Sequence, residues 1–342
     1  MKSYRANFYI LIFFIFLGIV GAGIFILEKA PEGRSGGEYF FKNAEIQSKN
    51  FPVFGEAYLL PIERALTPEK KEGGQVIEIY AKSVLVIDDL SGKILYEKSS
   101  REKVAIASIT KLATAAVILN LTGQNSPAGA GGAKYGLGRE ITIDKSAIEA
   151  DGDNGSLVVG ERIKARDLLT IMLIASSNDA AVALTEDIAL FGGQEKDAAY
   201  FVGLMNEFAR KNNLSDTRFA NPAGIDDKNN YSTAADVIKL SGILLKEYPE
   251  IFEITRISEA NVRSADGKYS HFIKNTNKLI GRLPNIVGGK TGYTDKAGES
   301  LLLIVKNPAN NHKITAVIIG AKDRFAEMEK LINWVFAAYE WK

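Results

Sequence analysis

The sequence predicts an α+β body in which one antiparallel sheet is covered by helices. Two hairpin signals predict the sheet: apolar runs at 84–87 and 93–96 flank a Gly-containing turn, and runs at 300–305 and 314–319 flank a turn rich in Asn. Helical patterns fill the residues between the hairpins, and a closing helix is expected from Arg324 to about Tyr339. This order fits a sheet that carries a helical subdomain, and about 260 residues are enough for one large core.

The N-terminal segment predicts a membrane anchor. Lys2 and Arg5 precede an unbroken apolar run at 8–27, which is about 20 residues and therefore about 30 Å of helix, the thickness of a bilayer core. The run contains a Gly-Ala-Gly string that offers a cleavage site, but apolar residues continue after it, so a retained anchor is favoured over a cleaved signal peptide. Cationic residues on the short side place residues 1–7 in the cytoplasm and the body outside the cell membrane.

The next segment, 28–75, predicts an extracytoplasmic tether, because it is rich in Gly, Pro and charged residues and has little core potential. Its aromatic residues, for example at 39–41, leave open the alternative that this segment docks on the body. The catalytic body is therefore assigned to 76–342. Within it, a Gly- and Ala-rich insert at 127–133 is expected to be a surface loop.

Composition excludes several classes of partner and cofactor. The formal net charge is +1, so the chain offers no basic field for a nucleic acid. It has no cysteine, which excludes a thiol nucleophile and a Cys-ligated metal. Asp151 and Asp153 resemble part of a calcium loop, but Arg162 stands where the bidentate Glu is needed. We therefore expect a turn there, and neither a metal nor a cofactor.

Three short strings occur in a fixed order: Ser-Ile-Thr-Lys at 108–111, Ser-Ser-Asn at 176–178 and Lys-Thr-Gly at 290–292. Each is weak alone, since Ser-x-x-Lys recurs at 100–103 and Ser-x-Asn at 48–50. Context separates them. An apolar run that predicts a buried helix follows the first string, whereas its rival lies in a charged stretch. Together the three strings predict a serine acyl-transfer site that needs no histidine.

A serine attacks a carbonyl only if a base takes its proton, and the usual base is a histidine. His271 and His312 lie in polar stretches and are expected to be solvated loop residues. A lysine must then be the base. Residues three apart on a helix share a face, which brings the Lys111 amine beside the Ser108 hydroxyl. Burial and a second cation, Lys290, would disfavour the charged form of that amine.

The second and third strings are expected to line a cleft. Ser176 and Asn178 lie between two apolar helical segments, where a tight turn would present their side chains to the site. Ser176 could relay a proton to the leaving amine, and Asn178 could bind Lys111 or a substrate amide. The alternative is a helix N-cap, for which Ser and Asn are preferred. Lys-Thr-Gly follows the strand-like run 285–289, whose glycines allow close approach and whose edge could accept an extended peptide; the alternative is a solvent-exposed turn.

The three strings are a mark of penicillin-binding proteins and class A β-lactamases. From about Ala81 to the C-terminus, the chain resembles the low-molecular-weight D-alanyl-D-alanine carboxypeptidases, the S11 serine peptidases. The likeness is carried by the segments at 86–96, 107–115, 221–226, 231–236 and 290–294. The resemblance implies the fold of penicillin-binding proteins and β-lactamases, acyl-enzyme chemistry on a peptidoglycan peptide ending in D-Ala-D-Ala, and β-lactams as covalent inhibitors.

The resemblance also implies residue roles. Ser108 would be the nucleophile and Lys111 the proton acceptor, while the substrate groove would be lined by Ser176, Asn178, Lys290, Thr291 and Gly292. The oxyanion hole would be the backbone N–H groups of Ser108 and Tyr293. Two positions depart from many relatives, Ser177 within the second string and Ala223 within Asn-Pro-Ala-Gly. Neither removes a reacting group, so we expect them to affect rate and substrate preference.

Several functions share this chemistry. The favoured one is an anchored D,D-carboxypeptidase, and a D,D-endopeptidase of cross-linked peptidoglycan stays open. A penicillin sensor is less favoured, because about seven residues precede the apolar run, too few for a cytoplasmic signalling domain. A β-lactamase needs a carboxylate that activates water, and Glu207 lacks the Glu-x-x-Leu-Asn setting.

Overall fold

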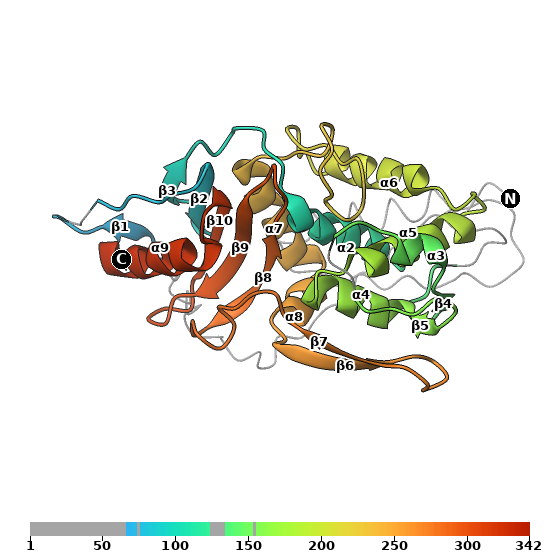
Figure 1. The fold of residues 1–342 in the computed structure, drawn as a ribbon. Helices are drawn as coiled ribbons and strands as arrows, with labels where there is room; N and C mark the ends of the chain where they lie inside the picture. Colours follow the sequence, from blue (N-terminus) through green and yellow to red (C-terminus); the bar gives the residue numbers. More distant parts are fainter. Residues whose placement is uncertain (1–65, 74–75, 124–133, 153–154) are drawn as a thin grey trace, which may run out of the picture. The chain divides into compact units, whose positions relative to one another are not determined.

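The computed structural model describes residues 66–73, 76–123, 134–152 and 155–342, which fall within one unit of the chain, Glu63–Lys342 (Figure 1). Its strands are β1 (Pro68–Lys70), β2 (Ser83–Asp88), β3 (Ile94–Lys98), β4 (Glu140–Thr142), β5 (Arg162–Lys164), β6 (Glu259–Arg263), β7 (Ser270–Lys274), β8 (Ile286–Gly292), β9 (Glu299–Lys306), β10 (Lys313–Ala321) and β11 (Tyr339–Trp341). Its helices are the 3₁₀ turn η1 (Ala107–Ile109), α2 (Thr110–Asn120), α3 (Lys145–Ile148), α4 (Ala165–Ile174), α5 (Asn178–Phe191), α6 (Ala198–Lys211), α7 (Ala234–Glu247), α8 (Glu250–Thr255) and α9 (Arg324–Ala338).

The main sheet has five antiparallel strands in the order β3-β2-β10-β9-β8. Both predicted hairpins are present, as β2 with β3 and as β9 with β10. Strand β10 joins them, because it pairs with β2 on one side and with β9 on the other. The two ends of the body therefore meet in one sheet, and the predicted α+β class is confirmed. Strand β8, which carries Lys-Thr-Gly, lies at one edge.

The side chains of the strands point alternately to the two faces of the sheet, and this divides the hydrophobic core into two layers. Successive side chains of a strand point to opposite faces of a sheet. Val84 and Leu301 pack in the layer that contains the α9 residues, whereas Leu85 and Leu302 pack in the layer with the remaining helices. Figure 1 shows α9 on one side of the sheet and α7 on the other. The sheet is thus covered on both faces and gives β8 a rigid support.

A helical subdomain follows β3 in the sequence. Its central helix is α2, in which every residue from Thr110 to Leu119 is buried. Helices α4 and α6 pack against α2, and α5 packs against both of them. The buried helix predicted after Ser108 is confirmed.

The N-terminal boundary of the body differs from the prediction. Residues Pro68–Lys70, assigned to the tether, form β1 and pair with β11 at the C-terminus. Main-chain pairing needs no apolar side-chain pattern, so a charged segment with little core potential still adds a strand here. The pairing also explains why α9 ends at Ala338, since the next residue belongs to β11. The predicted span 8–27, the tether up to residue 65 and the insert 127–133 lie outside the described residues.

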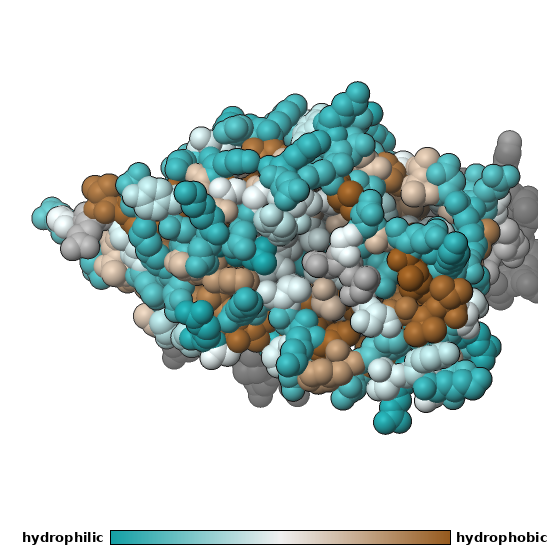
Figure 2. Space-filling model, in the orientation of Figure 1, coloured by the Kyte–Doolittle hydropathy of each residue, from teal (hydrophilic) through white to brown (hydrophobic). Residues whose placement is uncertain are grey.

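None of the helices in the described ranges combines the length and the apolar character needed to cross a bilayer. The face shown in Figure 2 is mainly hydrophilic, and its hydrophobic side chains form separate patches. Buried apolar residues instead fill the two layers on either side of the sheet.

Candidate active site

Ser108 and Lys111 lie at the start of the central helix and face each other. Ser108 is in η1, and Lys111 follows in the first turn of α2. The Lys111 Nζ atom donates to Ser108 Oγ at 2.7 Å. Lys111 has no exposed surface, although Ser108 is partly accessible. The pairing expected from the three-residue spacing is therefore present, with the amine buried and Ser108 partly accessible.

Two further oxygens hold the Lys111 amine. Its Nζ lies 2.6 Å from Asn178 Oδ1 and 2.7 Å from the Ala223 carbonyl oxygen. Asn178 belongs to the second string, so the first two strings meet at this amine. The Ala223 carbonyl has no chemical signature in a sequence, and its role was not predicted. Three oxygens from three separate segments leave the amine little freedom to move.

The Ser-Ser-Asn string divides its residues between a cap and the site. Ser177 is the N-cap of α5, and its Oγ accepts from the Ala180 N–H at 2.9 Å. The N-cap alternative therefore applies to the middle residue only. Ser176 has a φ of +62°, a left-handed conformation that costs a non-glycine residue about 1–3 kcal/mol and often marks a functional site. This conformation separates Ser176 from the cap and directs its hydroxyl toward Lys290.

A short loop holds Asn178 in the orientation that binds Lys111. The Asn178 Nδ2 atom donates to the Asp151 carbonyl at 2.5 Å, which leaves Oδ1 to accept from the lysine. The Asp179 carboxylate accepts from the Gly155 N–H at 2.7 and 2.9 Å and also bonds Ser177 Oγ. Asp151 thus acts through its backbone, and no cluster of three His, Cys, Asp or Glu side chains within the described ranges could hold a metal. Asp153 lies outside those ranges.

Strand β8 supplies the opposite side of the site. Lys290 is buried, and its Nζ donates to Ser176 Oγ at 2.8 Å and to the Thr291 carbonyl at 3.1 Å. The third string thus meets the second through a lysine and a serine. Thr291 is also buried, and its Oγ1 lies 2.5 Å from Thr276 Oγ1. Lys290 therefore contacts Ser176, which is two residues before the Asn178 that binds Lys111.

Close packing against η1 explains why the third string ends in glycine. A Cβ on Gly292 would lie 2.9 Å from the Ile106 carbonyl oxygen and 3.2 Å from the Ser108 nitrogen. Side chains at Gly288 would meet α8 in the same way. Strand β8 is an edge strand, as predicted, but its residues Gly288 to Gly292 are buried because α8 and η1 pack along it. The solvent-exposed-turn alternative is wrong.

The loop at 221–226 connects the helical side of the site to the turn after β8. The Asn221 Oδ1 atom accepts from the N–H groups of Gly224 and Ile225 at 2.7 and 3.0 Å. Gly224 has a φ of +87°, and a Cβ there would lie 2.0 Å from the Ala107 carbonyl oxygen. Asp226 accepts from Thr294 Oγ1 at 2.6 Å. This loop therefore presents the Ala223 carbonyl to Lys111 and anchors the turn that contains Tyr293, whose side chain is exposed.

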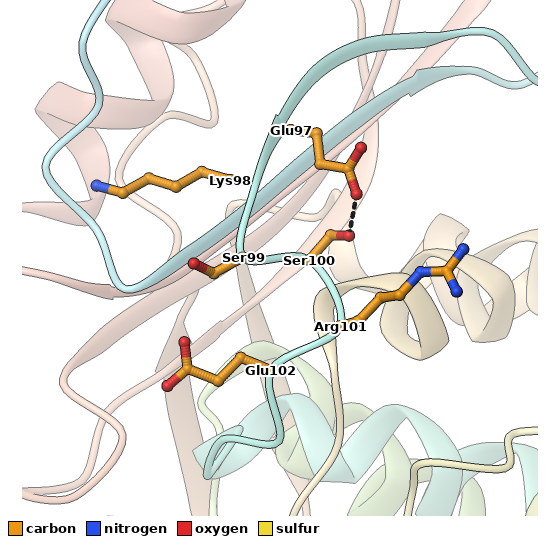
Figure 3. Close-up of a pocket in the computed structure, with 6 residues that line it drawn as sticks. All are labelled: Glu97, Lys98, Ser99, Ser100, Arg101 and Glu102. Atoms are coloured by element: carbon orange, nitrogen blue, oxygen red, sulfur yellow. Dashed lines mark hydrogen bonds between the residues drawn. The ribbon is translucent and has the colours of Figure 1, made fainter.

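The rival serine is outside this constellation. Ser100 lines a surface pocket formed by Glu97 to Glu102, where its hydroxyl donates to Glu97 (Figure 3). Lys103, the lysine of the rival string, pairs with the Asp216 carboxylate at 3.2 Å. Ser100 and Lys103 therefore have separate carboxylate partners and no mutual hydrogen bond, whereas Ser108 and Lys111 are bonded directly.

The prediction of two solvated loop residues is wrong for His271, and for His312 it is right about the loop between β9 and β10 but wrong about solvation, because that side chain is 9% exposed. His271 lies in β7 and is 7% exposed, with Nε2 2.9 Å from the buried Glu161 carboxylate. His312 places Nδ1 3.0 Å from the carboxylate of Asp88, which is fully buried. A carboxylate partner offsets the cost of burying a polar ring, which the sequence pattern does not show. Each of these ring nitrogens therefore belongs to a histidine–carboxylate pair.

Comparisons with known proteins agree on the family. A family model described as D-alanyl-D-alanine carboxypeptidase matches residues 68–323. The chain is 33% identical over 277 residues to the D-alanyl-D-alanine carboxypeptidase DacF of Bacillus subtilis, which covers 79% of this chain and 66% of that protein. It is 31% identical over 263 residues to a D-alanyl-D-alanine endopeptidase of Pseudomonas aeruginosa, which covers 75% of this chain and 78% of that protein. The chain thus spans slightly less than two thirds of DacF.

Solved structures show the same fold. A mutant of the Streptomyces K15 DD-transpeptidase matches with a TM-score of 0.66 and 24% identity, over 77% of this chain and 100% of the other. A D-alanyl-D-alanine carboxypeptidase from Mycobacterium tuberculosis matches with a TM-score of 0.65 and 23% identity, over 79% of this chain and 96% of the other. The architecture predicted from the two hairpins and the helices between them, and the fold that the resemblance implied, are therefore confirmed.

Proposed function

The chain belongs to the D-alanyl-D-alanine carboxypeptidase family of serine peptidases, and we propose that it hydrolyses the bond between the last two D-alanines of peptidoglycan stem peptides through an acyl-enzyme on Ser108. The observation that carries the proposal is the 2.7 Å contact between Lys111 Nζ and Ser108 Oγ inside a buried cluster. A serine next to a lysine is chemically useful only if the amine can take the serine's proton.

Acylation is proposed to require the neutral form of the Lys111 amine, because only that form can accept the Ser108 proton. A neutral amine has two N–H donors and one lone pair. In the neutral form, two N–H groups can donate to the oxygens of Asn178 and Ala223, and the lone pair can accept from the Ser108 hydroxyl, which reverses the donation to Ser108 Oγ described above. In acylation, Ser108 Oγ bonds to the carbonyl carbon of the penultimate D-Ala while its proton moves to Lys111. The carbonyl electron pair moves onto oxygen, and the N–H groups of Ser108 and Tyr293 are proposed to bind the oxyanion.

Ser176 is proposed to carry the proton to the leaving group. Lys290 donates to Ser176 Oγ at 2.8 Å, so the hydrogen of that hydroxyl is left to point at another acceptor. When the C–N bond breaks, the nitrogen of the terminal D-Ala takes the Ser176 proton, and Ser176 takes the proton held by Lys111. The left-handed backbone at Ser176 supports this role, because it turns the hydroxyl away from the cap and toward the cleft.

The third string is proposed to bind the free end of the substrate. A terminal D-Ala carries a carboxylate, and the buried cation of Lys290 together with the hydroxyl of Thr291 offers a charge and a donor on one strand. Asn178, at the start of α5, and Gly292, at the end of β8, are proposed to line the same substrate groove. Deacylation then reverses the proton path: water attacks the ester, its proton passes to Lys111, and Ser108 Oγ regains a proton as it leaves.

β-Lactams are proposed to acylate Ser108 by the same first step. With a peptide, the leaving D-Ala departs, whereas with penicillin the leaving amine stays tethered and obstructs water. Each 1.4 kcal/mol between the two deacylation barriers is a factor of ten, so an obstruction of ~4 kcal/mol gives about a thousandfold longer lifetime. Glu207, which pairs with Lys211 on the surface of α6, is not placed to activate that water. These features favour a peptidase over a β-lactamase.

The location is proposed from the N-terminal sequence. The apolar run at 8–27, with Lys2 and Arg5 before it, supports a single-pass anchor in the cell membrane with the catalytic body outside. Residues 1–7 would be cytoplasmic, and the remaining tether would begin at residue 28. The peptidoglycan is extracytoplasmic, so this orientation gives the site access to its substrate.

An endopeptidase acting on cross-linked peptidoglycan is the second candidate. The endopeptidase of Pseudomonas aeruginosa is covered over 78% of its length, more than the 66% of DacF. The test is to incubate the full-length protein with purified pentapeptide and with cross-linked dimers, and to identify the products by mass. Release of free D-Ala from the pentapeptide supports the carboxypeptidase, and conversion of dimers to monomers without D-Ala release supports the endopeptidase. Rapid penicillin hydrolysis with neither product contradicts both.

A further inference from the structure

A threonine outside the three strings contacts both the third string and the helix that precedes the second string. Thr276 lies in the connection between β7 and β8, and its Oγ1 is 2.5 Å from Thr291 Oγ1. Its backbone N–H donates to the Ile174 carbonyl at 3.2 Å, at the end of α4 just before the Ser-Ser-Asn turn. Thr276 is partly accessible, whereas Thr291 is buried. Thr276 thus joins the last residue of α4, two residues before Ser176, to the hydroxyl of Thr291.

The residues on either side hold Thr276 firmly. Asn275 Nδ2 donates to the carbonyl oxygens of Thr255 and Ile257 at 2.9 and 2.8 Å, and its Oδ1 accepts from the Asn277 N–H at 2.9 Å. The Asn277 Oδ1 atom accepts from the Leu279 N–H at 3.1 Å. Side chains that bond the backbone two residues on make rigid local turns. The hydroxyl of Thr276 is therefore presented to Thr291 by a fixed segment.

The contact between Thr276 and Thr291 affects how the two hydroxyl groups can donate hydrogen bonds. The two hydroxyl groups have two hydrogens in total, and one of these hydrogens lies in the short hydrogen bond between the two oxygens. The other hydrogen must be donated elsewhere. An anion at Thr291 draws that hydrogen from Thr291 and leaves Thr276 to donate into the shared bond. Each hydrogen bond in such a chain strengthens the next, so the pair is a better donor to an anion than one hydroxyl alone.

We propose that Thr276 is a positioning residue that sets the Thr291 hydroxyl to donate to a free terminal carboxylate, and thereby makes the site selective for that end over an uncharged one. The inference rests on the proposed function and names the substrate feature that the same site selects. An uncharged amide end draws the hydrogen less strongly, so its binding depends less on Thr276.

The test compares Thr276→Val, which keeps the shape but removes the hydroxyl, with Thr276→Ser, which keeps the hydroxyl. The full-length enzyme is assayed on a peptide ending in D-Ala-D-Ala and on the same peptide ending in D-alaninamide. We expect kcat/KM for the carboxylate peptide to fall about tenfold in Thr276→Val, mainly through KM, while the amide peptide changes less than about twofold. Thr276→Ser should restore the wild-type preference.

A second readout does not depend on D-Ala release. Acylation by benzylpenicillin and by its methyl ester compares a carboxylate with an uncharged ester on one scaffold, and the Val variant should lose rate with the first only. An equal loss with both ligands, or no loss with either, overturns the positioning role. Thermal melts identify a misfolded Val variant, in which case Thr276→Ala is compared with Thr276→Ser on the same ligand pair. Wild-type enzyme that is acylated but releases no D-Ala contradicts the proposed function while leaving the Thr276 comparison intact.

Discussion

Replacement of Lys111 by arginine tests the proposed base most directly. The amine has no exposed surface and lies 2.6–2.7 Å from oxygens of Ser108, Asn178 and Ala223. Arginine retains the positive charge of a protonated lysine, so a loss of activity is not caused by loss of that charge. Its guanidinium is not deprotonated in proteins and therefore cannot accept a proton. Lys111→Arg thus separates the role of the charge from the role of the base.

The expected loss follows from this environment. Removal of a general base typically costs about 10²–10⁴-fold in rate. Water cannot easily replace the amine, because the site is enclosed by the side chain of Asn178 and by the loop that presents Ala223. The planar fork of arginine also cannot match three oxygens that surround a single nitrogen. We therefore expect acylation by penicillin to fall toward the upper end of that range, about 10³–10⁴-fold.

The assay is the second-order rate of labelling by a fluorescent penicillin, measured on the full-length protein together with D-Ala release. Lys103→Arg is the matched control, because Lys103 belongs to the rival string, is 51% exposed and pairs with Asp216. The control should label within about twofold of the wild type, since exposed ion pairs contribute little. Near-normal labelling of Lys111→Arg, with an unchanged melting temperature, would refute the assignment and point to another proton acceptor.

Three other predictions address the nucleophile, a buried carboxylate and the topology. Ser108→Ala should abolish penicillin labelling while Ser100→Ala labels like the wild type; label that persists in Ser108→Ala means that a different residue is acylated. Burial raises the pKa of Asp89 to about 6, above its ordinary 3.8, so between these pH values the folded state holds a proton that the unfolded state has released. The free energy of unfolding should fall by at most about 2 kcal/mol as the pH rises from about 4 to about 6, and thermal melts of Asp89→Asn should show a flatter pH profile; an unchanged slope in that variant excludes Asp89 as the cause. Protease added to intact spheroplasts should release a catalytic fragment by cutting within residues 28–65, and protection until the membrane is lysed would reverse the proposed orientation.

The local part of the site could be predicted from the sequence. A three-residue spacing at the start of a helix places Lys111 beside Ser108 through backbone geometry alone. The same kind of reasoning located both hairpins and the closing helix, because the alternation of apolar residues and the turn residues lie within one short stretch of chain. Placing the three strings in one site depended on their order and flanking patterns, and the structure shows them in contact.

Only the tertiary structure decided the partners that are distant in sequence. The bond from Lys290 to Ser176 joins residues 114 positions apart, and the Ala223 carbonyl reaches Lys111 from 112 positions away. Such contacts depend on how the sheet packs against the helical subdomain, and a backbone carbonyl has no residue type to identify it. The pairing of Thr276 with Thr291 follows from the same packing.

The two incorrect predictions have the same cause. His271 and the strand Pro68–Lys70 both lie in stretches that are polar along the chain, and a polar stretch by itself indicates exposure. Burial of the histidine depends on the Glu161 carboxylate, and pairing of the strand depends on the backbone of β11. A sequence pattern shows which groups need a partner, through their hydrogen-bonding capacity and charge. Folding alone determines which distant group meets that need, because the partner is selected by three-dimensional packing and not by separation along the chain.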